Sequence, residues 1–160
     1  MNQTIFKTIY LATDQAGFAF KEKVREYLQK NDAYKVVDCG AFAFKEGDDY
    51  PEYIMLAAEK ISEGGPTVAG IVFGHSGQGE AIAAGKFPHI RSTVCYGGPE
   101  QLKIVSLGRE HNDANVLSIG AGFVAEADLI NVIEMWLTTP FSRDERHARR
   151  LAQLEKIESK

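Results

Sequence analysis

A glycine-rich turn, Gly74-His75-Ser76-Gly77-Gln78-Gly79-Glu80, is the segment of this 160-residue chain with the clearest potential for chemistry. It follows an apolar run that predicts a strand and opens a small-residue run that predicts a helix. Glycines let a backbone approach a ligand closely, and the N–H groups at a helix N-terminus form an anion site. The turn lacks the Lys-Ser/Thr of a P-loop and the spacing of a dinucleotide fingerprint. A connection selected only for its shape needs neither the Ser76 hydroxyl nor the Glu80 carboxylate, so a polar reaction site is the favoured interpretation.

Glu80 is the candidate base within this turn. A surface carboxylate that only compensates the helix dipole is the simpler interpretation of its position. However, the small apolar run at residues 81–84 (AIAA) favours partial burial of the first helical turn. A partly desolvated carboxylate beside an anion site would make an effective general base.

Two more polar groups occur at the ends of predicted elements. Asp14, followed by Gln15, ends the first predicted strand, where it can either cap the next helix or bind a ligand. Residues 109–113 (REHND) precede the fifth predicted strand. A lone histidine is usually structural, but His111 beside Asn112 favours a functional role, since imidazole titrates near neutral pH.

Three arginines share one face of a predicted C-terminal helix, because Arg146, Arg149 and Arg150 are spaced i, i+3 and i+4. A solvated helix face is one explanation. A phosphate site is the other, because the guanidinium fork matches phosphate oxygens. The histidines and cysteines of the chain show no metal-ligand spacing, so we expect no metal.

The elements that must position these groups alternate regularly along the chain. Buried strands are predicted at 8–13, 34–39, 68–73, 91–96 and 116–119, with helices at about 17–31, 51–63, 80–84, 100–110 and 125–137, and a last amphipathic helix from about 144. This alternation predicts one α/β domain over residues 1–160, a Rossmann-like three-layer α/β/α sandwich with a five-stranded, mostly parallel sheet. Ligands of such sheets bind outside the carboxyl ends of the strands, where Asp14 and the glycine-rich turn would lie.

Composition excludes several classes of protein. The formal net charge is −4, from 18 basic and 22 acidic residues, which argues against a nucleic-acid partner. No stretch approaches the roughly 18 apolar residues that span a bilayer, and no signal peptide is visible. Two cysteines are too few for a disulfide scaffold, so a reducing, cytoplasmic compartment is expected.

Six short motifs occur in a recognisable order over about residues 8–157. They are Thr13-Asp14-Gln15-Ala16-Gly17-Phe18, Asp49-Tyr50-Pro51, Ser76-Gly77-x-Gly79, Ile82-Ala83-Ala84-x-Lys86-x-Pro88-x-Ile90-Arg91, Arg109-Glu110-His111-Asn112-Asp113-Ala114-Asn115 and Arg146-His147-x-x-Arg150. Together they resemble the ribose-5-phosphate isomerase B family, which also contains the galactose-6-phosphate isomerase subunits. The resemblance implies a cofactor-free aldose–ketose isomerase of phosphorylated sugars. It also implies a homodimer, or a tetramer, with active sites shared between subunits and the C-terminal helix extending to the partner.

The resemblance assigns roles to individual residues. Family members use as base either a cysteine at the end of the third strand or a glutamate in the following helix. Gly74 and Glu80 stand at these two positions, so the chain resembles the glutamate-base branch. Ser76 and the amides of residues 77–79 would stabilise the enediolate, and His111 would open the sugar ring.

The remaining matches imply substrate contacts. They are Asp14, Gln15, Tyr50, His75, Gly77, Gly79 and Asn112 for the sugar, and Arg146 and Arg150 for the phosphate, at least one of the arginines across the dimer. Three features depart from the family pattern: Gln15 replaces a histidine, His75 replaces a glycine, and residues 97–101 lengthen the rim by about four residues. Ribose 5-phosphate is the expected substrate. The alternatives are galactose 6-phosphate, allose 6-phosphate, a four-carbon sugar phosphate, or sugar-phosphate binding without catalysis.

Overall fold

Five parallel strands form the centre of the computed structural model, which describes residues 5–159. They are β1 (Thr8–Thr13), β2 (Lys35–Asp38), β3 (Val68–Gly74), β4 (Ser92–Cys95) and β5 (Val116–Gly120). Their order across the sheet is β2-β1-β3-β5-β4, and every neighbouring pair is parallel. The predicted α/β architecture is confirmed.

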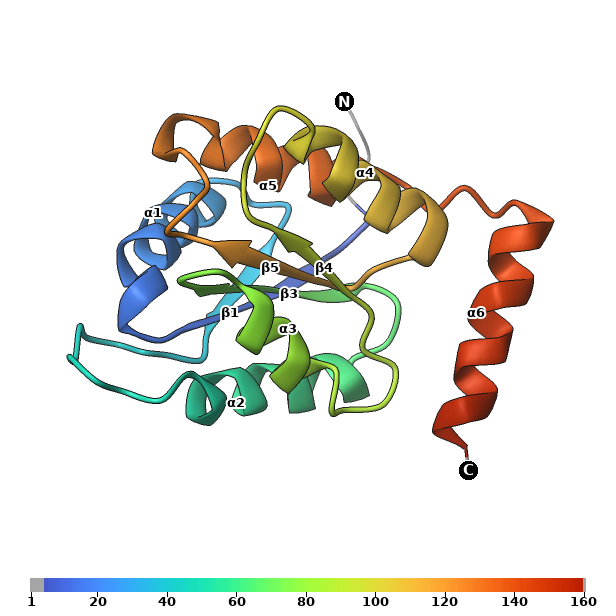
Figure 1. Ribbon diagram of the computed structural model, residues 1–160, viewed down its shortest axis with the longest axis horizontal. Coiled ribbons are helices and arrows are strands. Elements are labelled where there is room, and N and C mark those ends of the chain that lie inside the picture. The colour runs from blue at the N-terminus through green and yellow to red at the C-terminus, as the bar shows by residue number, and fades with distance from the viewer. Residues whose placement is uncertain (1–4, 160) are drawn as a thin grey trace.

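Helices cover both faces of this sheet (Figure 1). One layer contains α1 (Phe18–Gln29), α4 (Gln101–Asn112) and α5 (Leu129–Thr138), and the other contains α2 (Tyr50–Glu63) and α3 (Gln78–Ala84). Short 3₁₀ turns, Gln15–Gly17 and Glu126–Asp128, precede α1 and α5. The division follows from right-handed crossovers, because the chain moves across the sheet in one direction through α1 and α4 and in the other through α2 and α3.

The last helix, α6 (Glu145–Glu158), extends away from the sandwich (Figure 1). Its predicted apolar side is only partly covered, since Leu154 and Ile157 are 48% and 65% exposed. His147 in its first turn is the residue of this helix that is buried. No helix within residues 5–159 combines the length and the apolar character that crossing a membrane requires.

The end of α4 differs from the prediction in a way that affects the site. The helix continues two residues beyond the predicted end at 110, so His111 and Asn112 are helical rather than part of a loop. It stops at Asp113, which adopts a left-handed conformation with φ 45° and whose N–H donates to the Arg109 carbonyl at 3.0 Å. Aspartate tolerates this conformation better than most residues, but without a glycine the sequence marks the end only weakly.

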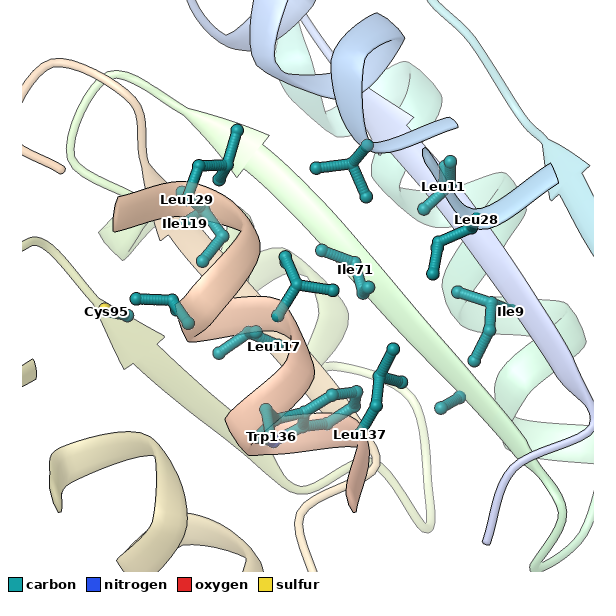
Figure 2. Packing of buried hydrophobic residues seen from close by; sticks show 14 of the residues in the cluster. Ile9, Leu11, Leu28, Ile71, Cys95, Leu117, Ile119, Leu129, Trp136 and Leu137 are labelled. Atoms are coloured by element: carbon teal, nitrogen blue, oxygen red, sulfur yellow. The ribbon is translucent and has the colours of Figure 1, made fainter. Parts of the chain in front are cut away.

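The larger core lies between the sheet and the α1–α4–α5 layer (Figure 2). The face of α5 predicted from its spacing is fully buried: Leu129, Ile133, Trp136 and Leu137. Figure 2 shows this face of α5 packed over β3 and β5, with Ile71 among its neighbours. Each apolar side chain of this size contributes roughly 1.5–3 kcal/mol when fully buried. This packing fixes the two central strands whose carboxyl ends carry the glycine-rich turn.

Arg109 is a charged group buried at the edge of this core, with 1% of its surface exposed. Its Nη1 donates to the Ala114 carbonyl at 2.6 Å, and its Nε donates to the Thr139 carbonyl at 3.2 Å. Nη1 also pairs with Asp113 Oδ1 at 3.0 Å, and the guanidinium carbon lies 4.7 Å from the centre of the Phe6 ring. Arg109 therefore connects the end of α4 to β5 and to the end of α5, and its role within residues 109–113 is structural.

We expect Arg109→Met to lower the free energy of unfolding by about 2–5 kcal/mol, because two buried carbonyls lose their donors. The control is Lys103→Met on the same helix, where the side chain is 71% exposed and a change below about 0.5 kcal/mol is expected. Denaturant unfolding of both variants measures the difference. Equal losses in the two variants would contradict the structural role of Arg109.

Candidate active site

The turn between β3 and α3 is held in place by contacts with residues of β5. Gly77 has φ 77°, and a Cβ on it would lie 3.1 Å from both the Gly120 nitrogen and the Ser118 hydroxyl oxygen. Ser118, which is fully buried, donates to the Gly77 carbonyl at 2.6 Å. Ser76 lies at the start of α3, and its hydroxyl oxygen accepts from the Gln78 N–H at 3.3 Å. The first N–H groups of a helix have no intrahelical partners, so this rigid turn presents donors at the carboxyl end of β3.

Glu80 folds back over the end of β3 and is 4% exposed. Its carboxylate occupies the space directly above Gly74, where any Cβ would overlap with it. Burial raises the pKa of Glu80, and the nearby Asp14 carboxylate raises it further, while the backbone N–H of Glu80 acts in the opposite direction. A carboxyl group with a raised pKa holds a proton more strongly than an ordinary glutamate, which suits a group that must take and return protons.

Asp14 lies at the neighbouring end of β1 and acts as a cap. Its Oδ1 accepts from the Ala16 N–H at 2.9 Å, at the start of the 3₁₀ turn. Burial raises the pKa of Asp14, and Asp48 adds to this, although the Ala16 N–H lowers it. The buried Thr13 hydroxyl oxygen lies 3.0 Å from the Phe73 carbonyl, which ties the ends of β1 and β3 together. Asp14 therefore caps the turn and also lies close enough to influence Glu80.

Gln15 and Tyr50 bring a third segment to this edge of the sheet. Gln15 donates its N–H to Asp48 Oδ1 at 2.9 Å, and its side-chain oxygen accepts from the Gly47 N–H at 3.0 Å. Tyr50, in the first turn of α2, lies over Gly79, where a Cβ would come within 2.7 Å of the phenol oxygen. The loop between β2 and α2 is thus joined to β1 at one point and to α3 at another.

His75 points toward a different loop. Its ring lies edge-on against Phe123, with 5.4 Å between the ring centres, and its carbonyl accepts from the Gly122 N–H at 2.9 Å. His75 is exposed, and its contacts are with the turn after β5. The structure thus places it at the rim of the glycine-rich turn.

The second group of predicted site residues lies at the opposite edge of the sheet. The Asn112 carbonyl accepts from Nε of Arg91 at 2.8 Å, and Arg91 immediately precedes β4. His111 and Asn112 therefore flank the amino ends of β4 and β5, whereas Glu80 lies at the carboxyl ends. Seven residues of β3 separate these edges, which corresponds to about 20 Å. Within one chain, the structure does not bring the two groups together.

His147 joins this second group, and the sequence analysis assigned it no role. Its ring is almost fully buried, lies 4.2 Å from the His111 ring centre to centre, and has Nδ1 2.9 Å from the Ser142 hydroxyl oxygen. Burial lowers the pKa of His147, and His111 and Arg146 lower it further. His147 occurs in the motif Arg146-His147-x-x-Arg150, in which only the two arginines were assigned a role. Arg146 and Arg150 themselves are exposed on α6.

Within residues 5–159, no three His, Cys, Asp or Glu side chains form a group that could hold a metal ion. The carboxyl edge offers a buried carboxylate, a hydroxyl and the backbone N–H donors at the start of α3. These are the groups that an enzyme uses to transfer a proton and to stabilise the negative charge that forms on an oxygen.

Comparison with known proteins identifies the family. The family model described as Ribose/Galactose Isomerase matches residues 9–154. Ribose-5-phosphate isomerase B of Mycobacterium tuberculosis is 35% identical over 150 residues, which cover 94% of this chain and 89% of the relative. The relative from Mycolicibacterium paratuberculosis is also 35% identical, over 94% and 91% of the two chains. The chain belongs to this ribose and galactose isomerase family and is an aldose–ketose isomerase.

Solved structures agree with this assignment. Ribose-5-phosphate isomerase B from Mycoplasma genitalium with bound ribulose-5-phosphate has a TM-score of 0.89 and 29% identity, covering 96% of this chain and 97% of that one. Type B ribose 5-phosphate isomerase from Trypanosoma cruzi has a TM-score of 0.86 and 31% identity, with the same coverage.

We expect Gly74→Ala to lower the kcat of isomerisation by roughly 10²-fold, because the added methyl group takes the space of the Glu80 carboxylate and displaces the base. Gly85→Ala is the control, since Gly85 has φ −68° at the end of α3 and a Cβ there would come no closer than 3.2 Å to its neighbours. Steady-state kinetics of both variants test this. A wild-type kcat in Gly74→Ala would contradict the placement of Glu80.

Proposed function

We propose that this chain interconverts ribose 5-phosphate and ribulose 5-phosphate through an enediolate, with Glu80 as the base. The observation that carries the proposal is the buried Glu80 carboxylate at the end of β3, beside Ser76 and the N-terminus of α3. The relatives that carry the name ribose-5-phosphate isomerase B, one of them with bound ribulose-5-phosphate, support the choice of sugar.

The reaction moves one proton between neighbouring carbons. Glu80 takes the proton from C2 of the open-chain aldose, and the electron pair of the C–H bond shifts to form the enediolate. The amides of residues 77–79 and the Ser76 hydroxyl stabilise the oxygen on which charge develops, and one such donor is worth about 3–4 kcal/mol in comparable sites. The hydroxyl proton on O2 then passes to O1 as the C2 carbonyl forms, and Glu80 returns its proton to C1, which gives the ketose. Because oxidation and reduction occur within the same molecule, the step needs no cofactor.

The other proposed site residues bind the substrate or prepare it. His111 acts first, as the acid–base group that opens the sugar ring. The residues proposed to contact the sugar are Asp14, Tyr50, His75, Gly77, Gly79 and Asn112, whereas Gln15, which the family resemblance also implies as a contact, makes its hydrogen bonds to Gly47 and Asp48. Arg146 and Arg150 bind the phosphate, and this remote binding energy positions the carbon chain over Glu80.

The proposal includes a homodimer with two shared active sites. His111 and Arg150 lie at the opposite sheet edge from Glu80, so a second copy must supply them. Exposed apolar side chains support the pairing: Ile82 on α3 is 63% exposed and Ile157 on α6 is 65% exposed. A two-fold arrangement that places α6 of one chain against α3 of the other covers both side chains and brings the arginines toward the base.

A reducing, cytoplasmic setting is part of the same proposal. Cys39 and Cys95 are both free thiols, and burial raises the pKa of each. Neither takes part in a disulfide, and the raised pKa values keep both largely protonated and unreactive. Two unpaired thiols are compatible with a compartment that maintains reduced cysteines.

Glu80→Gln tests the base. Turnover of ribose 5-phosphate should fall by roughly 10²–10⁴-fold, and incorporation of solvent deuterium into the sugar should fall with it. Glu59→Gln, an exposed change on α2, is the control. Wild-type protein is assayed in parallel on galactose 6-phosphate, allose 6-phosphate and a tetrose phosphate. A higher kcat/KM on any of these than on ribose 5-phosphate would overturn the choice of sugar, and near-normal exchange in Glu80→Gln would overturn the base.

Mixing two inactive variants tests the shared site. Glu80→Gln and Arg150→Ala subunits are combined by unfolding and refolding together. If each site takes Glu80 from one chain and Arg150 from the other, a mixed dimer has one doubly defective site and one intact site. About half of the dimers formed are mixed, so about one quarter of wild-type activity should return. Activity that stays at the level of the separate variants would show that each site is built from a single chain.

A further inference from the structure

The loop from Phe42 to Asp48, between β2 and α2, is attached to the rest of the chain at few points. Its beginning is anchored, because Ala41 donates its N–H to the Thr13 carbonyl at 2.8 Å at the end of β1. From residue 42 to residue 47 every side chain is exposed, with Phe42 at 75% and Phe44 at 64%. Burial and packing therefore do little to hold this stretch.

Two hydrogen bonds join the second half of the loop to the end of β1, and Gln15 makes both. The backbone N–H of Gln15 donates to Asp48 Oδ1 at 2.9 Å, and the Gln15 side-chain oxygen accepts from the Gly47 N–H at 3.0 Å. We call this pair of contacts the Gln15 latch. The Asp48 carboxylate also lies close to Tyr53 on α2, since burial raises the pKa of the Tyr53 phenol and Asp48 raises it further.

The latch acts at the point where the loop enters the active site. Asp48 is followed by Asp49 and then by Tyr50, whose phenol lies over Gly79 in the turn that carries Ser76 and Glu80. The carboxylate of Asp48 also lies close enough to Asp14 to raise its pKa, after the larger effect of burial. A loop released from Gln15 would move Asp48 and Tyr50 together, because only Asp49 separates them.

We propose that Gln15 is a positioning residue, which acts on the substrate by holding the 42–48 loop, and with it Tyr50, over the site. The inference rests on the proposed isomerase function and extends it. The base is carried by α3 and packs on β3, so releasing the latch disturbs substrate binding more than proton transfer. The amide of Gln15 serves the loop as a neutral acceptor, which a positively charged side chain could not do.

Kinetics and limited proteolysis test the latch together. Gln15→Met keeps the length of the side chain and removes its acceptor, and Asp48→Ala removes the acceptor of the Gln15 N–H. Each should raise the KM for ribose 5-phosphate by about three- to tenfold and leave kcat within about twofold. Each should also speed trypsin cleavage after Lys45, which lies in the exposed part of the loop. Gln29→Met, an exposed change on α1, is the matched control.

The double variant separates positioning from direct contact. If both residues act by holding one loop, Gln15→Met with Asp48→Ala raises KM no further than the larger single change. Gln15→Glu keeps the side-chain acceptor, so cleavage after Lys45 should stay as slow as in the wild type. KM effects that multiply, or a raised KM without faster cleavage, would overturn the latch and make Gln15 a direct substrate ligand.

The remaining outcomes are also decisive. An unchanged KM in both single variants overturns the proposal, as does a fall in kcat larger than the rise in KM. If the wild-type protein does not isomerise ribose 5-phosphate, the proposed function fails, and with it the role of the latch in that reaction. Cleavage after Lys45 then still reports whether Gln15 orders the loop, so the two failures can be told apart.

Discussion

The burial of the Glu80 carboxylate is the constraint on which the carboxyl edge of this protein depends. Glu80 has only 4% of its surface exposed, and burial of this kind destabilises the charged form of a carboxylate. Its neighbours must therefore leave room for the side chain, and their charges influence its pKa. Gly74 provides the space, because any larger residue would overlap with the carboxylate. Asp14 adds a second negative charge, which acts with burial to favour the protonated form. A side chain at position 74 and a glutamate folded over β3 in this way therefore exclude each other.

The surroundings of the carboxylate are held in place by residues that are not among the proposed catalytic groups. Ser118 holds the Gly77 carbonyl from β5, and Thr13 ties β1 to β3, both as buried hydroxyls inside the sheet. α5 packs Trp136 and its neighbours against the same central strands. The carboxyl edge is thus attached to strands that are buried in the core, whereas residues 42–47 of the neighbouring loop are exposed.

The position of His111 and the arginines follows from the direction of the chain in a parallel sheet. Every strand runs the same way, so each helix returns the chain to the amino edge, and its end lies on the far side from the strand ends. His111 and Asn112 end α4, and α6 begins beyond α5, so both belong to the amino edge. Extending α4 by two residues beyond its predicted end strengthens this placement, because it keeps His111 on the helix and against His147.

The sequence by itself determined the alternation of strands and helices, the buried face of α5 and the glycine-rich turn, because these depend on hydrophobic period and on local backbone chemistry. It also placed Glu80 at a helix start beside that turn. Only the tertiary structure decided that the Glu80 carboxylate folds into the space above Gly74, that Gln15 binds Gly47 and Asp48, and that Arg109 is a core residue. It also showed that His147 is buried against His111. Each of these depends on contacts between segments far apart in the chain, and no local spacing of residue types encodes the distance between them.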